Sequence, residues 1–493
     1  MSSIPARPSL RPPLPSKEAS EMRRMIASLT AAALLAAPVA GAAAQELPST
    51  PPPIPAPKAF KMPASETYTL DNGMKVTLIP YGVAPKAVVS LQVYAGGINE
   101  GPDTWLAGLT LDMMREGAAG MTAAQIAQKA ADMGGGLGTG SGATSSGVSI
   151  NVLSERTPDA IALVADVAQR PTFPESELAR VKANWNRRLA IALTQPGTLA
   201  NAAITRAYYG ADHPYGRVLP TPEQFGAYSA AQLKAWHAAN FGAKRAHLYI
   251  AGRFDAAAVK AAVEKAFGGW AMGPERELIP VDPKPGPQVL LVDRPDAPQS
   301  TINLMFPAPE AGSAGDIPMR VMNALLGGSF SSRITRNIRE EKGYTYSPGS
   351  GVGLLPTNAV WTFNADVTTA ATGPSLTEVF KEIRTLQQTP PGDEEAAGMR
   401  QYMAGLFVIT NSTAGTLVNT LATRDALGLP RDWVDTYVPA TLAVTPAQMS
   451  EAARRLPLDK MTLVVVGDLK VVTPQLQALP ELKGIEFETV TVP

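Results

Sequence analysis

The sequence predicts an α+β fold with two homologous domains, each a mixed sheet with helices, that face each other across a cleft. Three observations predict this fold. The chain has 493 residues, which is enough for two domains of roughly 200 residues each. Both halves begin with a pair of strands and end with a helix, a strand and a glycine. Between these ends lie amphipathic segments of helix length, so each half combines strands with helices.

The N-terminal segment is typical of a secretory signal peptide. Arg23 and Arg24 follow Met22, an apolar run spans residues 27–40, and the small residues Ala42–Ala44 end the segment. We expect cleavage after residue 44, with Met22 as an alternative start. The other interpretation is a membrane anchor, but about 14 apolar residues are too few to span a bilayer. A signal peptide predicts a periplasmic protein, and no later stretch is apolar for long enough to span a membrane.

Charge and cysteine content exclude several classes of function. Lys plus Arg and Asp plus Glu both number 43, so the formal net charge is zero. Nucleic-acid binding needs a surplus of basic residues, so we expect no nucleic-acid partner. The chain contains no cysteine, which excludes disulfides, thiolate metal ligands and cysteine nucleophiles.

A proline-rich linker is predicted over residues 45–65. Residues 51–57 favour an extended polyproline conformation, which cannot build a core. From Glu66 the pattern becomes globular, with a strand over residues 66–70 and a second strand over residues 74–80. The Asn-Gly pair between these two strands is a strong signal for a hairpin.

The start of this pattern recurs in the second half of the chain. Residues 76–80 lead to a strand over residues 88–93, and residues 289–293 lead in the same way to a strand over residues 301–306. An Ala-Pro pair lies in each connection. A twofold repeat of this length indicates a duplicated domain and not a solenoid.

The ends of the two halves correspond as well. Ser229 and Thr445 are N-cap residues of predicted helices, and Pro446 suits a first helical turn. Strands over residues 246–252 and 461–468 follow these helices. The clearest helices between the ends are predicted at 123–133, 175–193, 317–326 and 377–387.

These patterns predict the domain boundaries. The N-terminal domain spans residues 66–272, a linker rich in proline and glycine spans residues 273–287, and the C-terminal domain spans residues 288–493.

Two elements link the chain to a known family, and the first of them has two parts. Residues 325–333 contain a glycine pair and a Phe-Ser-Ser-Arg turn, and residues 338–347 run from Arg-Glu into an aromatic segment that we predict to be a strand. Residues 212–216 form a second, shorter element. Together with the duplication, these stretches resemble the pitrilysin/insulinase-type zinc peptidases, in particular the short two-domain members related to the mitochondrial processing peptidases. The resemblance covers nearly all of residues 66–469.

The resemblance implies a metal site that this chain lacks. In the family, a helix carries an H-x-x-E-H motif, and here the two histidine positions are Gly108 and Asp112. The glutamate position is Leu111. The family's third ligand is a glutamate on another helix, but residues 183–190 hold no carboxylate and include two arginines.

Three or four N, O or S ligands are needed to hold zinc. The chain has three histidines, His213, His237 and His247, and they fall in different predicted elements. We therefore predict no zinc or other cofactor in this chain. We interpret the helix that contains Gly108 as part of the hydrophobic core.

The resemblance also implies residues that this chain does carry. In the family, an Arg and a Tyr of the second domain face the zinc and hold the substrate, and these positions match Arg339 and Tyr346. Phe330, Ser331 and Tyr344 are further candidates for substrate binding, and Tyr344 would lie on the same face of a strand as Tyr346. The alternative is that Arg339 belongs to a solvated charged run and Tyr346 is an ordinary strand aromatic.

A glycine-rich stretch over residues 134–142 is not a phosphate-binding loop, because it follows a helix and precedes a strand. In the family this region is an edge strand to which an extended peptide can add.

Two functions fit these observations. The first is a non-catalytic, substrate-binding subunit of a heterodimeric zinc endopeptidase. In that complex Arg339 and Tyr346 act in trans on peptides, and a homologous partner subunit carries H-x-x-E-H and the zinc. The second is a stand-alone peptide-binding or structural protein that has lost peptidase activity. Hydrolysis through a different metal arrangement is a third, weaker hypothesis, since the three histidines are scattered.

Overall fold

The computed structural model describes residues 60–284, 286 and 288–492. The predicted signal peptide, Met22 and the first linker up to residue 59 lie outside the described residues, as do residues 285 and 287 of the second predicted linker. The described residues form one compact unit. Within the described ranges, no helix is both long and apolar enough to cross a membrane.

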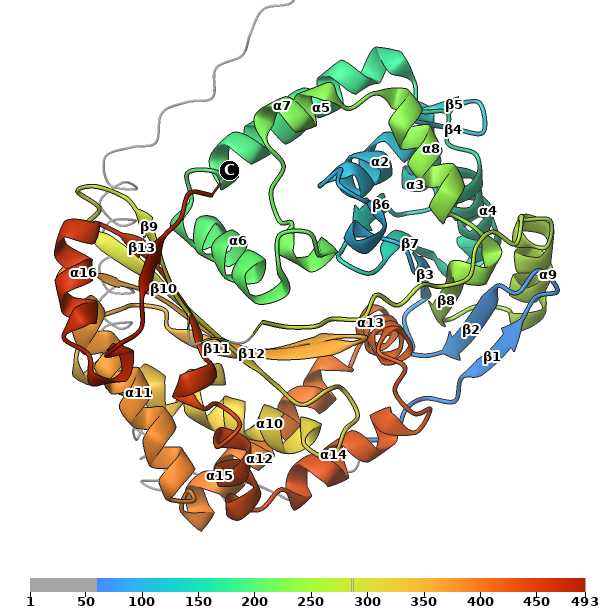
Figure 1. Ribbon diagram of the computed structural model, residues 1–493. Helices are drawn as coiled ribbons and strands as arrows, with labels where there is room; N and C mark the ends of the chain where they lie inside the picture. The colour runs from blue at the N-terminus through green and yellow to red at the C-terminus, as the bar shows by residue number, and fades with distance from the viewer. Residues whose placement is uncertain (1–59, 285, 287, 493) are drawn as a thin grey trace, which may run out of the picture. The chain divides into compact units, whose positions relative to one another are not determined.

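A six-stranded sheet forms the centre of the N-terminal half, which we define as residues 66–267 (Figure 1). In spatial order its strands are β1 (Glu66–Thr69), β2 (Lys75–Pro80), β8 (Ala246–Gly252), β3 (Lys86–Val93), β7 (Ser146–Leu153) and β6 (Leu137–Ser141). The predicted hairpin is present, because β1 pairs with β2 in antiparallel fashion. β2 and β8 are parallel, whereas β3 is antiparallel to both β8 and β7.

The C-terminal half, residues 288–492, contains a sheet of the same design. In spatial order its strands are β14 (Phe487–Thr489), β9 (Gln288–Asp293), β13 (Thr462–Gly467), β10 (Gln299–Pro307), β12 (Asn358–Thr368) and β11 (Gly349–Leu355). β9 and β13 are parallel, whereas β10 is antiparallel to both β13 and β12. Five strands of each sheet therefore correspond one to one, which confirms the predicted duplication. The outermost strands differ, since β1 precedes the repeat and β14 follows it.

Helices flank both sheets. The N-terminal half has α2 (Leu106–Met114), α3 (Ala123–Asp132), α4 (Thr157–Gln169), α5 (Glu175–Ala192), α6 (Pro196–Tyr209), α7 (Pro222–Ala227), α8 (Ala230–Asn240) and α9 (Ala256–Phe267). The C-terminal half has α10 (Asp316–Asn323), α11 (Thr372–Gln388), α12 (Asp393–Thr410), α13 (Ala414–Ala426), α14 (Trp433–Ala443), α15 (Pro446–Ala453) and α16 (Leu469–Gln477). Ser229 and Thr445 cap α8 and α15 as predicted, each accepting the N–H of a glutamine three residues later.

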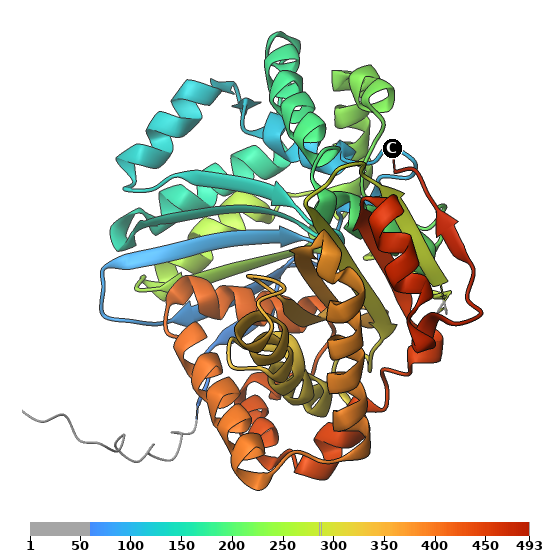
Figure 2. The ribbon, with the colours of Figure 1, turned by 90° about the vertical axis from the view of Figure 1, so that its left-hand side faces the viewer.

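One helix of each half packs against the sheet of the other half. α6 lies against β9, β10 and β13, and its residues Leu199, Ile204 and Tyr208 are buried against Val464 and Val466. In the same way α13 lies against β3 and β8 of the first sheet. Figure 1 shows α6 beside the second sheet, and Figure 2 shows the orange helices of the C-terminal half beneath the first sheet. This exchange buries apolar surface of both halves in shared cores, which explains why the two halves form one unit.

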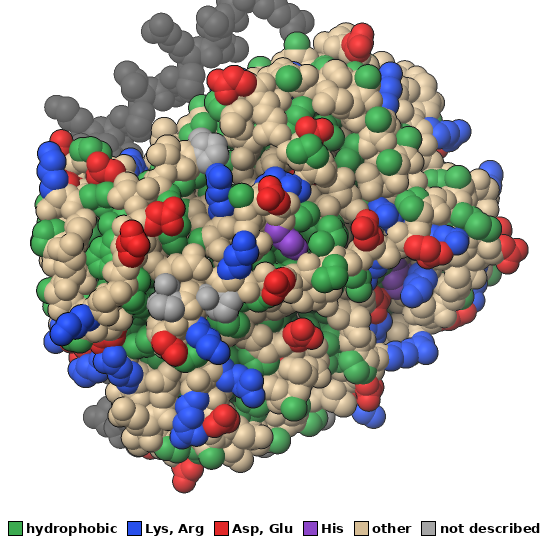
Figure 3. Space-filling view, viewed as in Figure 1, with side chains coloured by type: hydrophobic (Ala, Val, Ile, Leu, Met, Phe, Trp, Pro, Cys, Tyr) green, Lys and Arg blue, Asp and Glu red, His purple; other side chains and the backbone are tan. Residues whose placement is uncertain are grey.

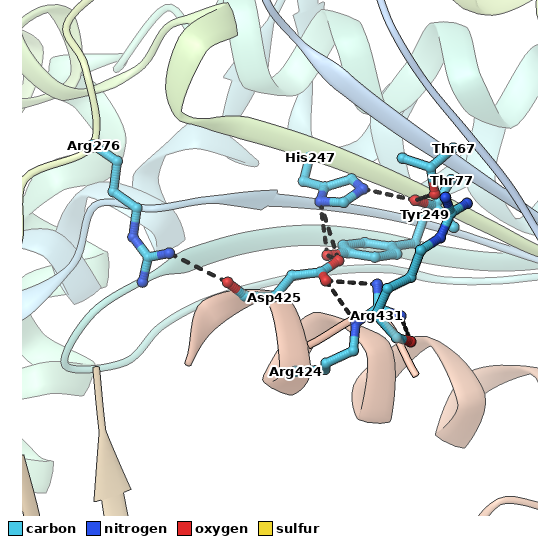
Figure 4. Close-up of polar contacts among 8 residues, drawn as sticks. All are labelled: Thr67, Thr77, His247, Tyr249, Arg276, Arg424, Asp425 and Arg431. Carbon is cyan, nitrogen blue, oxygen red and sulfur yellow. Dashed lines mark hydrogen bonds and ion pairs between the residues drawn. The ribbon is translucent and has the colours of Figure 1, made fainter. Parts of the chain in front are cut away.

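A buried polar network adds to the contact between β8 and α13 (Figure 4). The Tyr249 hydroxyl donates to Asp425 Oδ2 at 2.8 Å and lies 2.9 Å from His247 Nδ1. On the other side of the ring, His247 Nε2 lies 2.8 Å from the Thr77 hydroxyl. Arg424 donates two hydrogen bonds to Asp425 Oδ1, at 2.8 and 2.6 Å. Burial lowers the pKa of His247 to about 4, so the imidazole is neutral at neutral pH.

The surface charge is mixed on the face that Figure 3 shows. Lys and Arg side chains are interspersed there with Asp and Glu side chains. This distribution agrees with the equal numbers of basic and acidic residues in the sequence.

Candidate functional site

The helix at the predicted metal position is α2, and its residues are mostly buried. Leu109 and Leu111 are fully buried in the core of the N-terminal half, and the Thr110 hydroxyl donates back to the Leu106 carbonyl at 2.8 Å. Gly108 faces α5. A Cβ atom at this position would lie 2.6 Å from Cη2 of Trp185, so the indole packs directly on the backbone of α2 and a side chain at position 108 would clash with it.

Trp185 of α5 lies against Gly108 and Asp112, the two positions that match the family's histidines. Its indole Nε1 donates to Asp112 Oδ2 at 2.9 Å. The Arg188 guanidinium lies 5.0 Å from the centre of the indole ring and 3.8 Å from Asp112 Oδ2. Arg115 lies 3.3 Å from Asp112 Oδ1. The Asp112 carboxylate is thus engaged by one indole and two guanidinium groups.

These residues do not fit a zinc ion. The carboxylate at the second histidine position is paired with Arg115 and Arg188, and the Trp185 indole lies against both positions that match the histidines. Among residues 60–284, 286 and 288–492, no three His, Asp or Glu side chains lie together as a group that could hold a metal. The side chains at this position therefore form a packed contact between two helices and not a set of metal ligands.

The three histidines are engaged separately. His213 Nε2 lies 3.2 Å from the Pro280 carbonyl, and His237 Nε2 lies 2.8 Å from the Ala168 carbonyl. His247 belongs to the network with Asp425. Each has a structural partner, in agreement with their scattered positions in the sequence.

Glu100 holds the N-terminus of α2. Its carboxylate accepts hydrogen bonds from the backbone N–H groups of Ala107, at 2.7 Å, and Trp105, at 3.1 Å. These N–H groups have no partner within the helix, so the carboxylate satisfies them. Burial nevertheless raises the pKa of Glu100 to about 7, against the opposing effect of these hydrogen bonds. Local sequence patterns did not indicate Glu100, because the signal is a contact between a loop and a helix end.

A cavity of about 590 Å³ opens beside Gly108 and Trp185, between the two halves. Trp105, Tyr209 and Tyr215 contribute aromatic surface to it. The end of β6 lines it from the N-terminal half, and parts of β10, β11 and β12 line it from the C-terminal half. The cavity confirms the predicted cleft between the halves.

The glycine-rich stretch forms an edge strand. β6 pairs with β7 on one side and has no strand of the described residues on the other. Its N–H and C=O groups on the open side can pair with an added extended peptide. The space around Gly136 and Gly140 is open, since a Cβ there would meet no atom within 4 Å.

The structure brings Arg339, Tyr346 and Phe330 together. The Arg339 guanidinium lies 4.5 Å from the Phe330 ring centre and 4.9 Å from the Tyr346 ring centre. Both rings are exposed, Phe330 to 68% and Tyr346 to 79% of their surface. The two rings flank one guanidinium and present adjoining apolar surface, and contiguous exposed apolar surface is a feature of binding sites. We call these three residues the arginine–aromatic cluster.

Local structure holds the arginine–aromatic cluster in place. Arg339 lies on a π-helical segment, Thr335–Glu341, which starts after the Ser-Ser-Arg turn. Arg333 of this turn forms two hydrogen bonds to Glu395 of α12, at 2.9 and 2.6 Å. The glycine pair before the turn permits close packing, because a Cβ at Gly327 would lie 2.6 Å from the Ser350 hydroxyl.

The other candidate residues lie near the cluster but differ in setting. Ser331 is exposed next to Phe330. Tyr344 is partly buried against the core of the C-terminal half. The prediction that Tyr344 and Tyr346 share a strand is wrong. Their segment has a single bridge, Thr345 to Val367, and the nearest strand, β11, begins at Gly349.

The two predicted parts of the site are separate within the chain. Gly108 and Trp185 line the cavity between the halves, whereas Phe330, Arg339 and Tyr346 do not. The sequence patterns did not single out Trp185 as the residue that packs against the positions of the family's histidines. The complementary sizes of Gly108 and Trp185, a glycine facing the largest side chain, are the signal that could have indicated it.

Comparisons with known proteins agree with this architecture. Residues 76–221 match the family described as Insulinase (Peptidase family M16), and residues 227–403 match the Peptidase M16 inactive domain. The chain belongs to the M16 peptidase family. The two matches follow each other along the chain in the order of the two homologous halves.

Curated relatives of this M16 chain carry the name of zinc proteases. An uncharacterized zinc protease of Bacillus subtilis, YmxG, is 22% identical over 408 residues, which cover 81% of this chain and 97% of that protein. An uncharacterized zinc protease of Mycobacterium bovis is 27% identical over 301 residues, which cover 59% of this chain and 68% of that protein.

Solved structures show the same fold. A peptidase M16 inactive domain from Pseudomonas fluorescens has a TM-score of 0.75 and 24% identity, and the match covers 82% of this chain and 98% of that chain. A protease from Helicobacter pylori has a TM-score of 0.76 and 15% identity, covering 83% and 100% of the two chains.

Proposed function

We propose that this M16 chain is the non-catalytic, substrate-binding subunit of a heterodimeric zinc metalloendopeptidase. The observation that carries the proposal is the exposed arginine–aromatic cluster, which the chain displays at its surface although Gly108 and Asp112 stand at the positions of the family's histidines and pack against Trp185. A homologous partner subunit with an intact H-x-x-E-H helix would supply the zinc, and peptides would be the substrates.

The chemistry of the cluster suits a role in trans. No carboxylate of the described residues lies within 4.0 Å of the Arg339 guanidinium nitrogens, so their N–H groups are available to a peptide carbonyl or carboxylate. The Tyr346 hydroxyl can donate to the oxygen that becomes negative when water attacks a peptide carbonyl. The exposed rings offer apolar surface to the substrate and partner.

Reconstitution tests this proposal. The chain and an H-x-x-E-H homologue from the same genome are purified separately and then mixed with a fluorogenic peptide library. We expect cleavage by the mixture, little cleavage by either chain alone, and loss of cleavage when zinc is removed by a chelator. Metal analysis should find zinc in the homologue. Equal activity of the homologue with and without this chain would contradict the proposal.

A stand-alone peptide-binding protein is the second candidate function. The open edge of β6 and the adjoining cavity favour it, because an extended peptide could bind there without a partner. This candidate predicts a monomer or homodimer that binds peptides but gains no activity on mixing. For either function we propose a periplasmic location, which N-terminal sequencing of the mature protein would test.

A further inference from the structure

One guanidinium group in the cavity between the halves has no acidic partner among the described residues. Arg217 lines both the 590 Å³ cavity beside Trp185 and a neighbouring cavity of about 630 Å³. Its Nη1 donates to the backbone carbonyl of Asp212 at 2.7 Å. No carboxylate of the described residues lies within 4.0 Å of its nitrogens. The fold thus holds a cation in a cleft and leaves most of its hydrogen-bonding capacity unused.

The Arg217 charge lowers the pKa of Glu100, in opposition to burial, but the two side chains do not form an ion pair. Its carboxylate is bonded to the N–H groups of Trp105 and Ala107 at the start of α2. The guanidinium can therefore bind a carboxylate from outside, and a planar Arg–carboxylate contact is bidentate and charge-assisted.

The same cavity has a large apolar wall. The indoles of Trp105 and Trp185 stack edge to face, with ring centres 5.4 Å apart. Met305, Leu354 and Val360 line the cavity from the C-terminal half. Both indole N–H groups already donate within the protein, to the Val218 carbonyl and to Asp112. The rings consequently offer apolar surface, and a volume of about 590 Å³ is within the range of small-ligand sites.

We propose that this cavity binds the C-terminal residue of a peptide, with the terminal carboxylate on Arg217 and an apolar side chain against Trp105 and Trp185. The proposal deepens the peptide-binding part of the proposed function, since it rests on the chain binding peptides. It is independent of the partner and of Arg339 and Tyr346, because the cavity is formed by this chain alone.

Matched peptides test the carboxylate contact. The whole chain, without a partner, is titrated into fluorescein-labelled Gly-Ala-Ala-Phe as the free acid and as the C-terminal amide, and binding is measured by fluorescence anisotropy. We expect the acid to bind about tenfold more tightly than the amide, because a charge-assisted hydrogen bond is lost in the amide. A third peptide, an amide with an internal aspartate, should bind as weakly as the first amide.

Two arginine variants make the test specific. Arg217→Gln should bind acid and amide equally. Arg253→Gln is the matched control, because Arg253 also donates to a backbone carbonyl, at 3.1 Å from Val83, and lines a different cavity. It should keep the preference for the acid. Thermal unfolding checks that both variants fold.

Four results would overturn the proposal, and three of them concern the carboxylate. They are equal binding of acid and amide by the native chain, a preference that survives Arg217→Gln, and an internal aspartate that substitutes for the terminal carboxylate. A lack of measurable binding at millimolar peptide overturns it too. The reconstitution experiment does not depend on these results, so failure of this inference and failure of the proposed function are distinguishable.

The apolar wall is tested by changing the last residue of the peptide. A peptide that ends in phenylalanine should bind at least about fivefold more tightly than one that ends in glycine, because the phenyl ring buries apolar surface against the indoles. Trp185→Ala should reduce this ratio towards one while keeping the preference for the acid over the amide. A ratio that Trp185→Ala leaves unchanged contradicts the assignment of the indole wall.

Discussion

Gly108 has no side chain, and the Trp185 indole packs in the space that this leaves beside α2. The glycine removes the side chain that would project from α2, and the indole from α5 occupies the space and donates to Asp112. Polar metal ligands are thereby replaced by packing and one charge-assisted hydrogen bond. At the scale of residues, the family's metal position has become part of the chain's own stable structure.

Glu100 predicts a pH dependence of stability. Its pKa rises from an ordinary value of 4.5 to about 7 in the folded protein. Between these values the folded state keeps a proton that the unfolded chain releases. Glu100 therefore contributes stability that is complete below pH 4.5 and is lost as the pH rises through 7. His247 acts in the opposite sense, because its pKa falls to about 4 and its contribution is lost as the pH falls from 6.5.

Chemical denaturation of Glu100→Gln at several pH values checks this prediction. The free energy of unfolding of the variant relative to the native chain should rise by about 2 kcal/mol between about pH 5 and pH 8, because glutamine does not ionise. Glu223→Gln, on the exposed first turn of α7, serves as control and should show no such trend. A difference between Glu100→Gln and the native chain that is constant with pH would contradict the prediction.

At the scale of elements, the polar network between β8 and α13 predicts a large effect of one substitution. Asp425→Asn replaces one carboxylate oxygen, which accepts from Arg424 or Tyr249, with an NH2 group that cannot accept. We expect a loss of about 2–3 kcal/mol in the free energy of unfolding, since hydrogen bonds to a charged group are lost. Urea denaturation measures it. Asp432→Asn, an exposed position without a capping hydrogen bond, should change stability by less than about 0.5 kcal/mol.

Local patterns predicted many elements well. Alternation and the Asn-Gly turn predicted β1 and β2, and the Ser and Thr caps predicted α8 and α15, because these signals act between residues close in sequence. The predicted helix over 317–326 is α10 followed by a π-helical segment, Ala324–Gly328. There Asn323 accepts from Trp361 and Ser350 of neighbouring strands, contacts that no local pattern contains.

Long-range features could not be predicted from the sequence, because they depend on contacts between residues far apart in the chain. The exchange of α6 and α13 between the sheets depends on which apolar face meets which sheet. The setting of Tyr344 also depends on tertiary contacts, because a single bridge at Thr345 replaces the predicted strand. The resemblance predicted a shared role for Arg339 and Tyr346, whereas the position of the Arg339 guanidinium beside the rings of both Phe330 and Tyr346 required the structure.

At the scale of the whole described unit, the exchanged helices join the two halves through shared cores. Opening the chain between its halves would expose the apolar contacts of α6 and α13 and break the network around Asp425. Substrate entry in the proposed complex is therefore expected to occur between subunits. The exposed arginine–aromatic cluster then faces a partner, while the cavity at Arg217 remains within this chain.

The most direct test of the proposed role in trans measures cleavage by the reconstituted complex with altered cluster residues. Arg339→Ala combined with Tyr346→Phe should lower kcat/KM by at least about 100-fold, because donors to the developing negative charge are lost, with the zinc content of the partner unchanged. The control combines Arg336→Ala, on the same π-helical segment, with Tyr402→Phe, an exposed tyrosine of α12. It should keep activity within about threefold of the native complex, because neither residue belongs to the cluster. Native-level cleavage by the Arg339 and Tyr346 variant would contradict the central claim.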